Sequence, residues 1–130
     1  MIKRVLIFLL VILLVIGIAS CDTTDSPTEN SCSLSAEPLN DANGYLVTYK
    51  AEKTGDGVMT KLTYVDNTGT ITVENPELPW QKTFTFSNEN QNAKMTAEGK
   101  TTNGSLRIEI FGTVGVGNFT ASDDCSSSSN

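Results

Sequence analysis

The sequence predicts an all-β domain, a small seven-stranded antiparallel β-sandwich of the immunoglobulin-like kind. Three observations support this prediction. Apolar and polar residues alternate with a period of two in one short run after another, residues typical of turns separate the runs, and no stretch after residue 20 has helical periodicity. A period of two gives each strand one buried face and one wet face, which suits two sheets packed against each other.

The alternating runs follow one another from residue 45 to residue 119. Their apolar members are, in order, Tyr45 to Ala51, Val58 to Tyr64, Ile71 and Val73, Phe84 and Phe86, Ala93 to Ala97, Leu106 to Ile110, and Val114 to Phe119. Turns are predicted at residues 54–57, 66–69, 76–79, 87–92 and 101–104. The 66–69 turn predicts a short hairpin loop with Gly69 at positive φ. Glycines at 112, 115 and 117 predict a weakened last strand or a bulge.

The N-terminus carries a targeting segment. Lys3 and Arg4 precede a 14-residue apolar run, 5–18, which leads into Ala19, Ser20 and Cys21. A spanning helix needs about 20 apolar residues and the core of a signal peptide about 7–15. The segment resembles a bacterial lipoprotein signal peptide, which implies a lipid on Cys21. The alternative is an uncleaved signal anchor with Cys21 as an ordinary cysteine.

The chain divides into four parts on this interpretation. Residues 1–20 are the lipoprotein signal peptide, 21–31 the lipidated N-terminus and flexible tether, 32–125 the β-sandwich domain and 126–130 a disordered tail. The tether contains no large apolar residue, so it has nothing to bury. We expect the domain to be extracytoplasmic, anchored by lipid to the cell membrane or the outer membrane.

Two cysteines remain when Cys21 is assigned to lipid. Cys32 and Cys125 bracket almost the whole domain, and export permits a disulfide between them. The alternative is a pair of free thiols, which an oxidising compartment disfavours. We therefore predict a bridge that ties the first segment of the domain to its last.

Composition excludes several classes of function. Without Lys3 and Arg4, seven of the nine basic residues remain beside 15 acidic ones, so the mature net charge is −8. A domain that binds nucleic acids or docks on anionic lipid headgroups needs a basic surface, and this acidic chain argues against both. The chain contains no histidine, which removes Ser-His-Asp and Cys-His sites and most zinc sites. We expect no enzyme activity, no metal and no cofactor.

Acidic pairs and one tryptophan are the candidates for contact with a ligand. Asp123 with Asp124, and Asp56 with Asp66, do not have the spacing of an EF-hand and are interpreted as solvated carboxylates. Trp80 follows Leu78 and Pro79 at the entrance to a strand, where it could stack on a sugar ring or anchor a partner. We predict instead that Trp80 is mostly buried at the edge of the sandwich and packs against Tyr49, Leu62 and Phe84.

A longer stretch, from Val47 to Phe86, resembles a known family. It contains Val47-Thr48-Tyr49, Thr54-Gly55-Asp56-Gly57, Leu62-Thr63-Tyr64-Val65-Asp66, Thr72-Val73-Glu74-Asn75 and Leu78-Pro79-Trp80-Gln81-Lys82-Thr83-Phe84. This order is similar to the extracytoplasmic domain of the mycobacterial small membrane protein (MmpS) family, and over residues 45–125 Leu106-Arg107-Ile108 and Cys125 continue it. The resemblance implies a small β-sandwich that assists RND-type exporters of lipids and siderophores. Family members differ in usually having an uncleaved membrane helix, and often a cysteine in the strand that matches Leu106.

Together these observations predict a lipid-anchored envelope module that binds without catalysis and assists an integral membrane transporter of the RND type. The alternative is an adhesin-like surface lipoprotein that binds glycans or another extracellular ligand. Exposure of Trp80 distinguishes the two, because an open aromatic groove favours glycans and a buried ring with a flat polar surface favours a protein partner.

Overall fold

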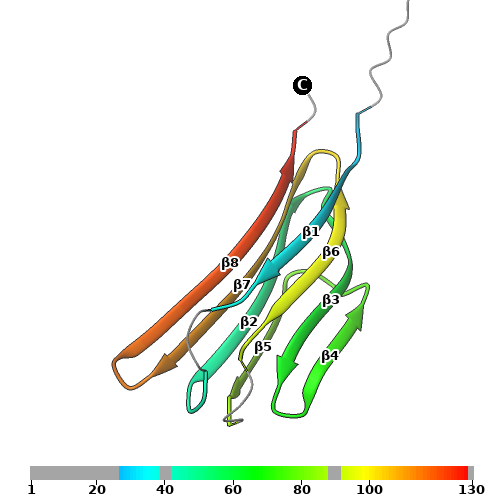
Figure 1. The fold of residues 1–130 in the computed structure, drawn as a ribbon. Helices are drawn as coiled ribbons and strands as arrows, with labels where there is room; N and C mark the ends of the chain where they lie inside the picture. The colour runs from blue at the N-terminus through cyan, green and yellow to red at the C-terminus, as the bar shows by residue number, and fades with distance from the viewer. Residues whose placement is uncertain (1–26, 39–41, 88–91, 129–130) are drawn as a thin grey trace, which may run out of the picture.

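A computed structural model describes residues 27–38, 42–87 and 92–128, which form two four-stranded antiparallel sheets packed face to face (Figure 1). The strands are β1 (Asn30–Ala36), β2 (Leu46–Gly55), β3 (Val58–Asp66), β4 (Gly69–Glu74), β5 (Trp80–Thr85), β6 (Met95–Thr101), β7 (Gly104–Val114) and β8 (Gly117–Ser127). The predicted all-β sandwich is confirmed. The predicted number of strands, seven, is wrong, because the described residues form eight.

One sheet has the strand order β1-β6-β3-β4 and the other has the order β5-β2-β7-β8. Five connections, β1–β2, β2–β3, β4–β5, β5–β6 and β6–β7, pass from one sheet to the other, while the hairpins β3–β4 and β7–β8 each stay within a sheet. Four strands are therefore edges: β1 and β4 of the first sheet, and β5 and β8 of the second. In Figure 1 the long β7–β8 hairpin extends beyond the end of β1.

The strand that sequence reasoning missed is β1. Its buried residues are Cys32, Leu34 and Ala36, and serines alternate with them. The pattern has a period of two, but only one of its buried residues is a large aliphatic, so the signal is weak. Pairing with β6 along the whole strand, from Asn30 opposite Thr101 to Ala36 opposite Met95, provides the backbone hydrogen bonds. Asn30 and Ser31, assigned to the tether, thus belong to the sheet.

The C-terminal boundary also differs from the prediction. The run from Val114 to Phe119 is not one strand, because the chain turns at Gly115, whose φ is 52°. After this turn β8 pairs with β7 residue by residue until Ser127 lies opposite Gly104. Ser126 and Ser127 were assigned to a disordered tail because they are polar; pairing with β7 places them in the sheet instead.

The core lies between the inner faces of the two sheets. Alternation predicted it well, because Val47, Tyr49 and Ala51 of β2 are fully buried, as are Leu106, Ile108 and Ile110 of β7. The Tyr49 hydroxyl donates a 2.6 Å hydrogen bond to the carbonyl oxygen of Val65, which satisfies its buried polar atom. Burial raises the pKa of Tyr49 above its usual value, so the ring stays neutral in the core.

The edges of the two sheets are joined where β1 meets β8. A disulfide links Cys32 to Cys125 with their Cα atoms 5.8 Å apart, which confirms the predicted bridge. Beside it, the backbone N–H of Ser35 donates to Asp123 Oδ2 at 2.9 Å. The amide of Asn30 donates to the carbonyl oxygen of Ser126 at 3.3 Å. Side chains thus form hydrogen bonds with backbone groups of the two edge strands, which would otherwise be open to pairing with another strand.

The sandwich has two ends, which we call proximal and distal. The proximal end contains the start of β1, the end of β8, and the β2–β3 and β6–β7 turns, since Asn30 lies opposite Thr101 and Gly55 opposite Gly104. The distal end contains the β3–β4 turn at residues 66–69 and the β7–β8 turn at residues 114–117. Figure 1 shows the start of β1 and the end of β8 side by side at the proximal end.

Candidate functional site

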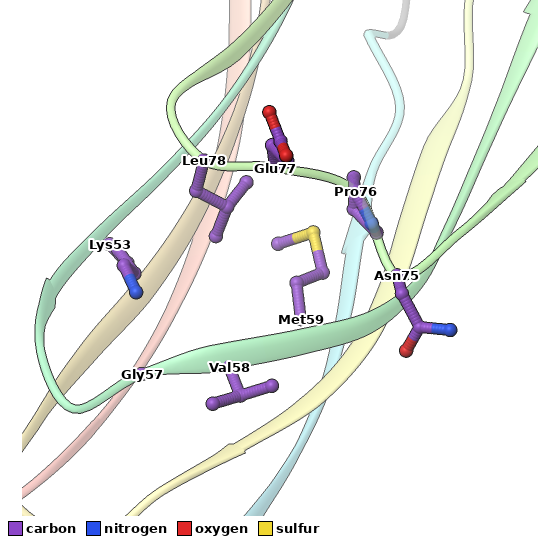
Figure 2. A pocket seen from close by; sticks show the side chains of 8 residues that line it. All are labelled: Lys53, Gly57, Val58, Met59, Asn75, Pro76, Glu77 and Leu78. Carbon is purple, nitrogen blue, oxygen red and sulfur yellow. The ribbon is translucent and has the colours of Figure 1, made fainter.

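The proximal end contains a pocket of about 410 Å³ between β2, β3 and the segment that connects β4 to β5 (Figure 2). Its lining residues are Lys53, Gly57, Val58, Met59, Asn75, Pro76, Glu77 and Leu78. The volume falls within the range of about 300–1,000 Å³ that is typical of small-ligand pockets. We take this hollow, the proximal pocket, as the candidate site.

The backbone around the proximal pocket explains why it stays open. The pairing of β3 with β6 shifts register between Met59 and Lys61, a bulge of the kind that re-aims side chains. Opposite this bulge, Asn75 leaves β4 with a φ of 49°, a left-handed conformation that asparagine adopts more readily than most residues. The N–H of Asn75 donates to the carbonyl oxygen of Thr60 at 2.8 Å and holds the connecting segment beside β3.

The pocket has an apolar floor and a charged rim. Met59, only 2% exposed, rises from β3, and half-buried Leu78 hangs from the connecting segment toward it (Figure 2). Val58 adds an exposed apolar side chain. Lys53 and Glu77 stand at the rim on different elements, β2 and the connecting segment, and no ion pair joins them. Such a site suits an apolar group of a partner that has polar or charged groups next to it, which would meet the rim.

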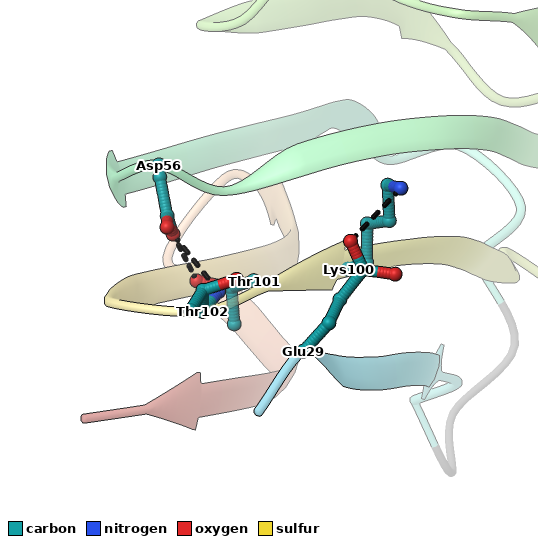
Figure 3. Close-up of polar contacts among 5 residues, drawn as sticks. All are labelled: Glu29, Asp56, Lys100, Thr101 and Thr102. Atoms are coloured by element: carbon teal, nitrogen blue, oxygen red, sulfur yellow. Dashed lines mark hydrogen bonds and ion pairs between the residues drawn. The ribbon is translucent and has the colours of Figure 1, made fainter. Parts of the chain in front are cut away.

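A carboxylate clamp fixes the turns beside the pocket (Figure 3). Asp56 Oδ1, in the β2–β3 turn, accepts hydrogen bonds from Thr101 Oγ1 at 2.8 Å and from the N–H groups of Thr102 and Asn103 at 3.0 and 2.9 Å. The bond from the Asn103 N–H is the largest cause that holds the pKa of Asp56 below its usual value. The clamp ties the two proximal hairpin turns together.

Glycine at position 55 is required for this clamp. Gly55 has a φ of 56°, and a Cβ there would run into the carbonyl oxygen of Asn103. Figure 3 also shows the exposed pair Glu29–Lys100, 2.9 Å apart. A solvated pair of this kind adds little to stability, so Asp56 is the stronger link.

Trp80 does not line the proximal pocket. It opens β5 opposite Ala51, is half-buried, and packs its ring against Tyr64 with the centroids 5.2 Å apart. The expected neighbours Tyr49 and Phe84 come next in a chain of ring contacts, because Tyr49 touches both Tyr64 and Phe84. Trp80 is thus the outer member of an aromatic cluster that reaches into the core.

The acidic pairs do not converge on a cation site. Asp56 and Asp66 lie at opposite ends of β3, and Asp66 Oδ1 accepts from the N–H and hydroxyl of Thr68 within its own turn. Asp123 accepts from Ser35 and from the N–H of Asp124. Within residues 27–38, 42–87 and 92–128 no group of three or more His, Cys, Asp or Glu side chains is placed to hold a metal ion.

The residues of the proximal pocket were missed at the sequence level. Val58 and Met59 were assigned to a strand, and Pro76 to Pro79 to a turn, but nothing local shows that the two segments face each other. The only signal was the pair of prolines, Pro76 and Pro79, which predict a rigid connection. Cys21, the predicted lipidation site, lies outside the described residues.

Comparison of the chain with protein-family models, with curated proteins and with solved structures finds no match. In the described part of the chain, no helix has the length and apolar character needed to cross a membrane.

Proposed function

We propose that this protein is a lipid-anchored binding module of a bacterial cell envelope, which acts without catalysis and assists an integral membrane partner. The signal-peptide resemblance at residues 1–21 supports the anchor, and the MmpS resemblance of residues 45–125 suggests a transporter of the RND type as the partner. A chain without histidine has few means of acid–base or nucleophilic catalysis near neutral pH, which supports a binding role.

The observation that carries the proposal is the position of the proximal pocket. It lies at the same end of the sandwich as Asn30, where β1 begins. Cys21 precedes Asn30 by nine residues, which span at most about 30 Å when fully extended. A lipid on Cys21 would therefore keep Asn30, at the proximal end, within about that distance of the membrane surface. A partner embedded in the same membrane is within reach.

The chemistry of the pocket supports a protein partner more than a glycan. Its floor is formed by Met59 and Leu78, and no aromatic side chain lines it. An apolar side chain of the partner, inserted between these two residues, would be buried at the centre of an interface with Lys53 and Glu77 at its rim. The glycan alternative expects an open aromatic groove at Trp80, but Trp80 is half-buried and packs on Tyr64.

Site-specific photo-crosslinking in intact cells tests the proposal. A photoreactive amino acid at Glu77, on the pocket rim, should capture an integral membrane protein that mass spectrometry then identifies. The matched control is the same amino acid at Glu98, an exposed glutamate on the outer face of β6. Recovery of only soluble or extracellular proteins, or equal capture from both positions, would rule out the accessory role.

The glycan alternative gives a different result. An adhesin-like lipoprotein would retain glycans on an array, and Trp80→Ala would fold yet lose that retention. Binding of this kind, with no membrane protein captured from position 77, would replace the proposal.

A further inference from the structure

Exposed apolar side chains are concentrated at the distal end of the sandwich. Among the described residues five large hydrophobic side chains are exposed, and four of them gather there: Leu46 at 48%, Phe111 at 39%, Val114 at 41% and Val116 at 107%. The fifth, Val58, belongs to the proximal pocket. Single exposed apolar residues are ordinary, but a cluster marks an interaction surface. We call these four residues the distal patch.

Strand register places Leu46 and Phe111 side by side on the outer face of the second sheet, whereas Val114 continues the inward-facing alternation of β7 and is exposed because it lies with Val116 at the tip of the hairpin. Leu46 lies opposite Thr113, and Phe111 lies opposite both Thr48 and Thr120, so Leu46 and Phe111 are diagonal neighbours on the outer face of the second sheet. Val114 and Val116 flank the turn at Gly115 immediately beyond them. Figure 1 shows this hairpin projecting past the end of β1.

The outer face of this sheet changes character along its length. Its two most distal rows, taken across β5, β2, β7 and β8, are Thr85-Leu46-Thr113-Asn118 and Thr83-Thr48-Phe111-Thr120. Neither row contains a charge. The following rows contain Lys50 with Glu109, then Glu52, Arg107 and Asp124. The distal half of this face is therefore uncharged and bears apolar side chains, although the chain as a whole is acidic.

Aromatic packing stabilises the β7–β8 hairpin, which bears Phe111, Val114 and Val116 of the patch. Phe119 of β8 packs its ring on Gly112 of β7, and the ring of Tyr45 lies 5.0 Å from that of Phe119. The exposed side chains are therefore held on a braced surface, which loses little conformational entropy when it is covered.

We infer that the distal patch is a membrane contact, at which the domain touches the same bilayer that holds its lipid anchor. The inference rests on the lipid anchor of the proposed function. The tether of about 30 Å is comparable in length to β7, whose 11 residues span about 37 Å, so a tilted domain brings the patch down to the surface. Aliphatic and aromatic side chains without charge suit the boundary between headgroups and acyl chains.

The small size of the distal patch disfavours a second copy, and its lack of charge permits contact with a lipid surface. Anionic headgroups repel the acidic remainder of the domain but not the uncharged rows. Two copies that dock stably need about 800 Å² from each partner, more than four partly exposed side chains provide. A weak contact suffices on a membrane, because the anchor raises its effective concentration.

Depth-dependent quenching of fluorescence tests the inference. The full lipidated protein is placed in vesicles of phosphatidylcholine and phosphatidylglycerol, with Trp80→Phe to remove the native fluorophore. One variant adds Val116→Trp in the distal patch, and the matched control adds Val58→Trp at the proximal end. When part of the phosphatidylcholine carries brominated acyl chains, the V116W variant should lose most of its emission, and the V58W variant should keep most of its own.

Three results would overturn the inference. Emission that bromine leaves unchanged in both variants means that the patch stays in water. A blue shift of V116W without bromine quenching means that a second copy or another protein covers the patch. Equal quenching in both variants means that the domain lies on the surface without preference. Intact mass of the reconstituted protein verifies the lipid on Cys21 separately, so failure of the anchor and failure of the patch are distinguished.

Discussion

The ring of Phe119 packs directly on the backbone of Gly112, its partner across the β7–β8 hairpin. Gly112 is buried, and the absence of a side chain leaves the space that the ring fills. The ring of Tyr45 lies 5.0 Å from this ring, so one glycine admits an aromatic pair near the tip of the β7–β8 hairpin. The glycine that the sequence suggested as a weakness of the strand is thus a packing site.

Gly112→Ala should therefore destabilise the domain. A Cβ at this position would overlap the ring of Phe119, and overpacking of this kind costs about 1–3 kcal/mol. Urea unfolding followed by circular dichroism measures the loss. The matched control is Gly117→Ala in the same hairpin, where the nearest atom would lie at 3.4 Å, an acceptable contact. Equal effects of the two substitutions would show that the general change in backbone entropy from glycine to alanine, and not the clash with the ring, determines the result.

Loss of the disulfide should have the largest effect of any change to the edges. Cys32 and Cys125 are 93 positions apart, and closing a loop of that length stabilises a fold by about 4–5 kcal/mol in the chain-entropy model. The double variant C32S/C125S should unfold at correspondingly lower urea. A reducing agent should destabilise the parent protein and leave the double variant unchanged. Equal stability of parent and double variant would contradict the predicted contribution.

Trp80→Ala should lower stability by about 2–3 kcal/mol, less than the ~3–5 kcal/mol of a fully buried aromatic residue. The ring is half-buried, and its pair with Tyr64 adds to the burial of apolar area. Trp80→Phe, which keeps a ring beside Tyr64, should recover most of the loss. If Trp80→Ala unfolds at the same urea concentration as the parent, the side chain serves a ligand and not the core.

The Asp56 clamp predicts a dependence of stability on pH. Hydrogen bonds from Asn103, Thr101 and Thr102 hold the folded pKa of Asp56 below its unfolded value of about 3.9. The contribution is therefore complete at pH values above the unfolded pKa, and it is lost as the pH falls through the lower, folded pKa. The free energy of unfolding of the parent should exceed that of Asp56→Asn at pH 7, and the difference should shrink below about pH 4.

The comparison between parent and variant isolates Asp56 from other carboxylates. Hydrogen bonds from Thr68 also lower the pKa of Asp66, but Asp66 is present in both proteins and its titration cancels. Urea unfolding at a series of pH values from 7 to 2 measures the difference. A difference that stays constant down to pH 2 would show that the charge of Asp56 does not contribute through the clamp.

Much of the fold could be predicted from local pattern. In β2 and β7 the alternation of apolar and polar residues places the buried side chains correctly, because a strand with one buried face must repeat every two residues. The 66–69 turn was also predictable, and Gly69 has the expected positive φ of 124°. The pair Cys32–Cys125 could be proposed from the count of cysteines and the predicted export of the chain.

Other features depend on which strands become neighbours. The serines of β1 leave only a weak apolar pattern in the sequence, and its strand character follows from its pairing with β6 and its disulfide to β8. The proximal pocket exists because the bulge at Met59 faces the segment after Asn75, and the distal patch because Leu46 and Phe111 meet on adjacent strands. The sequence by itself determined the all-β class and the buried faces of most strands, since these depend on residues close together. Only the tertiary structure decided the sites, because each combines side chains from strands whose adjacency depends on long-range pairing and packing.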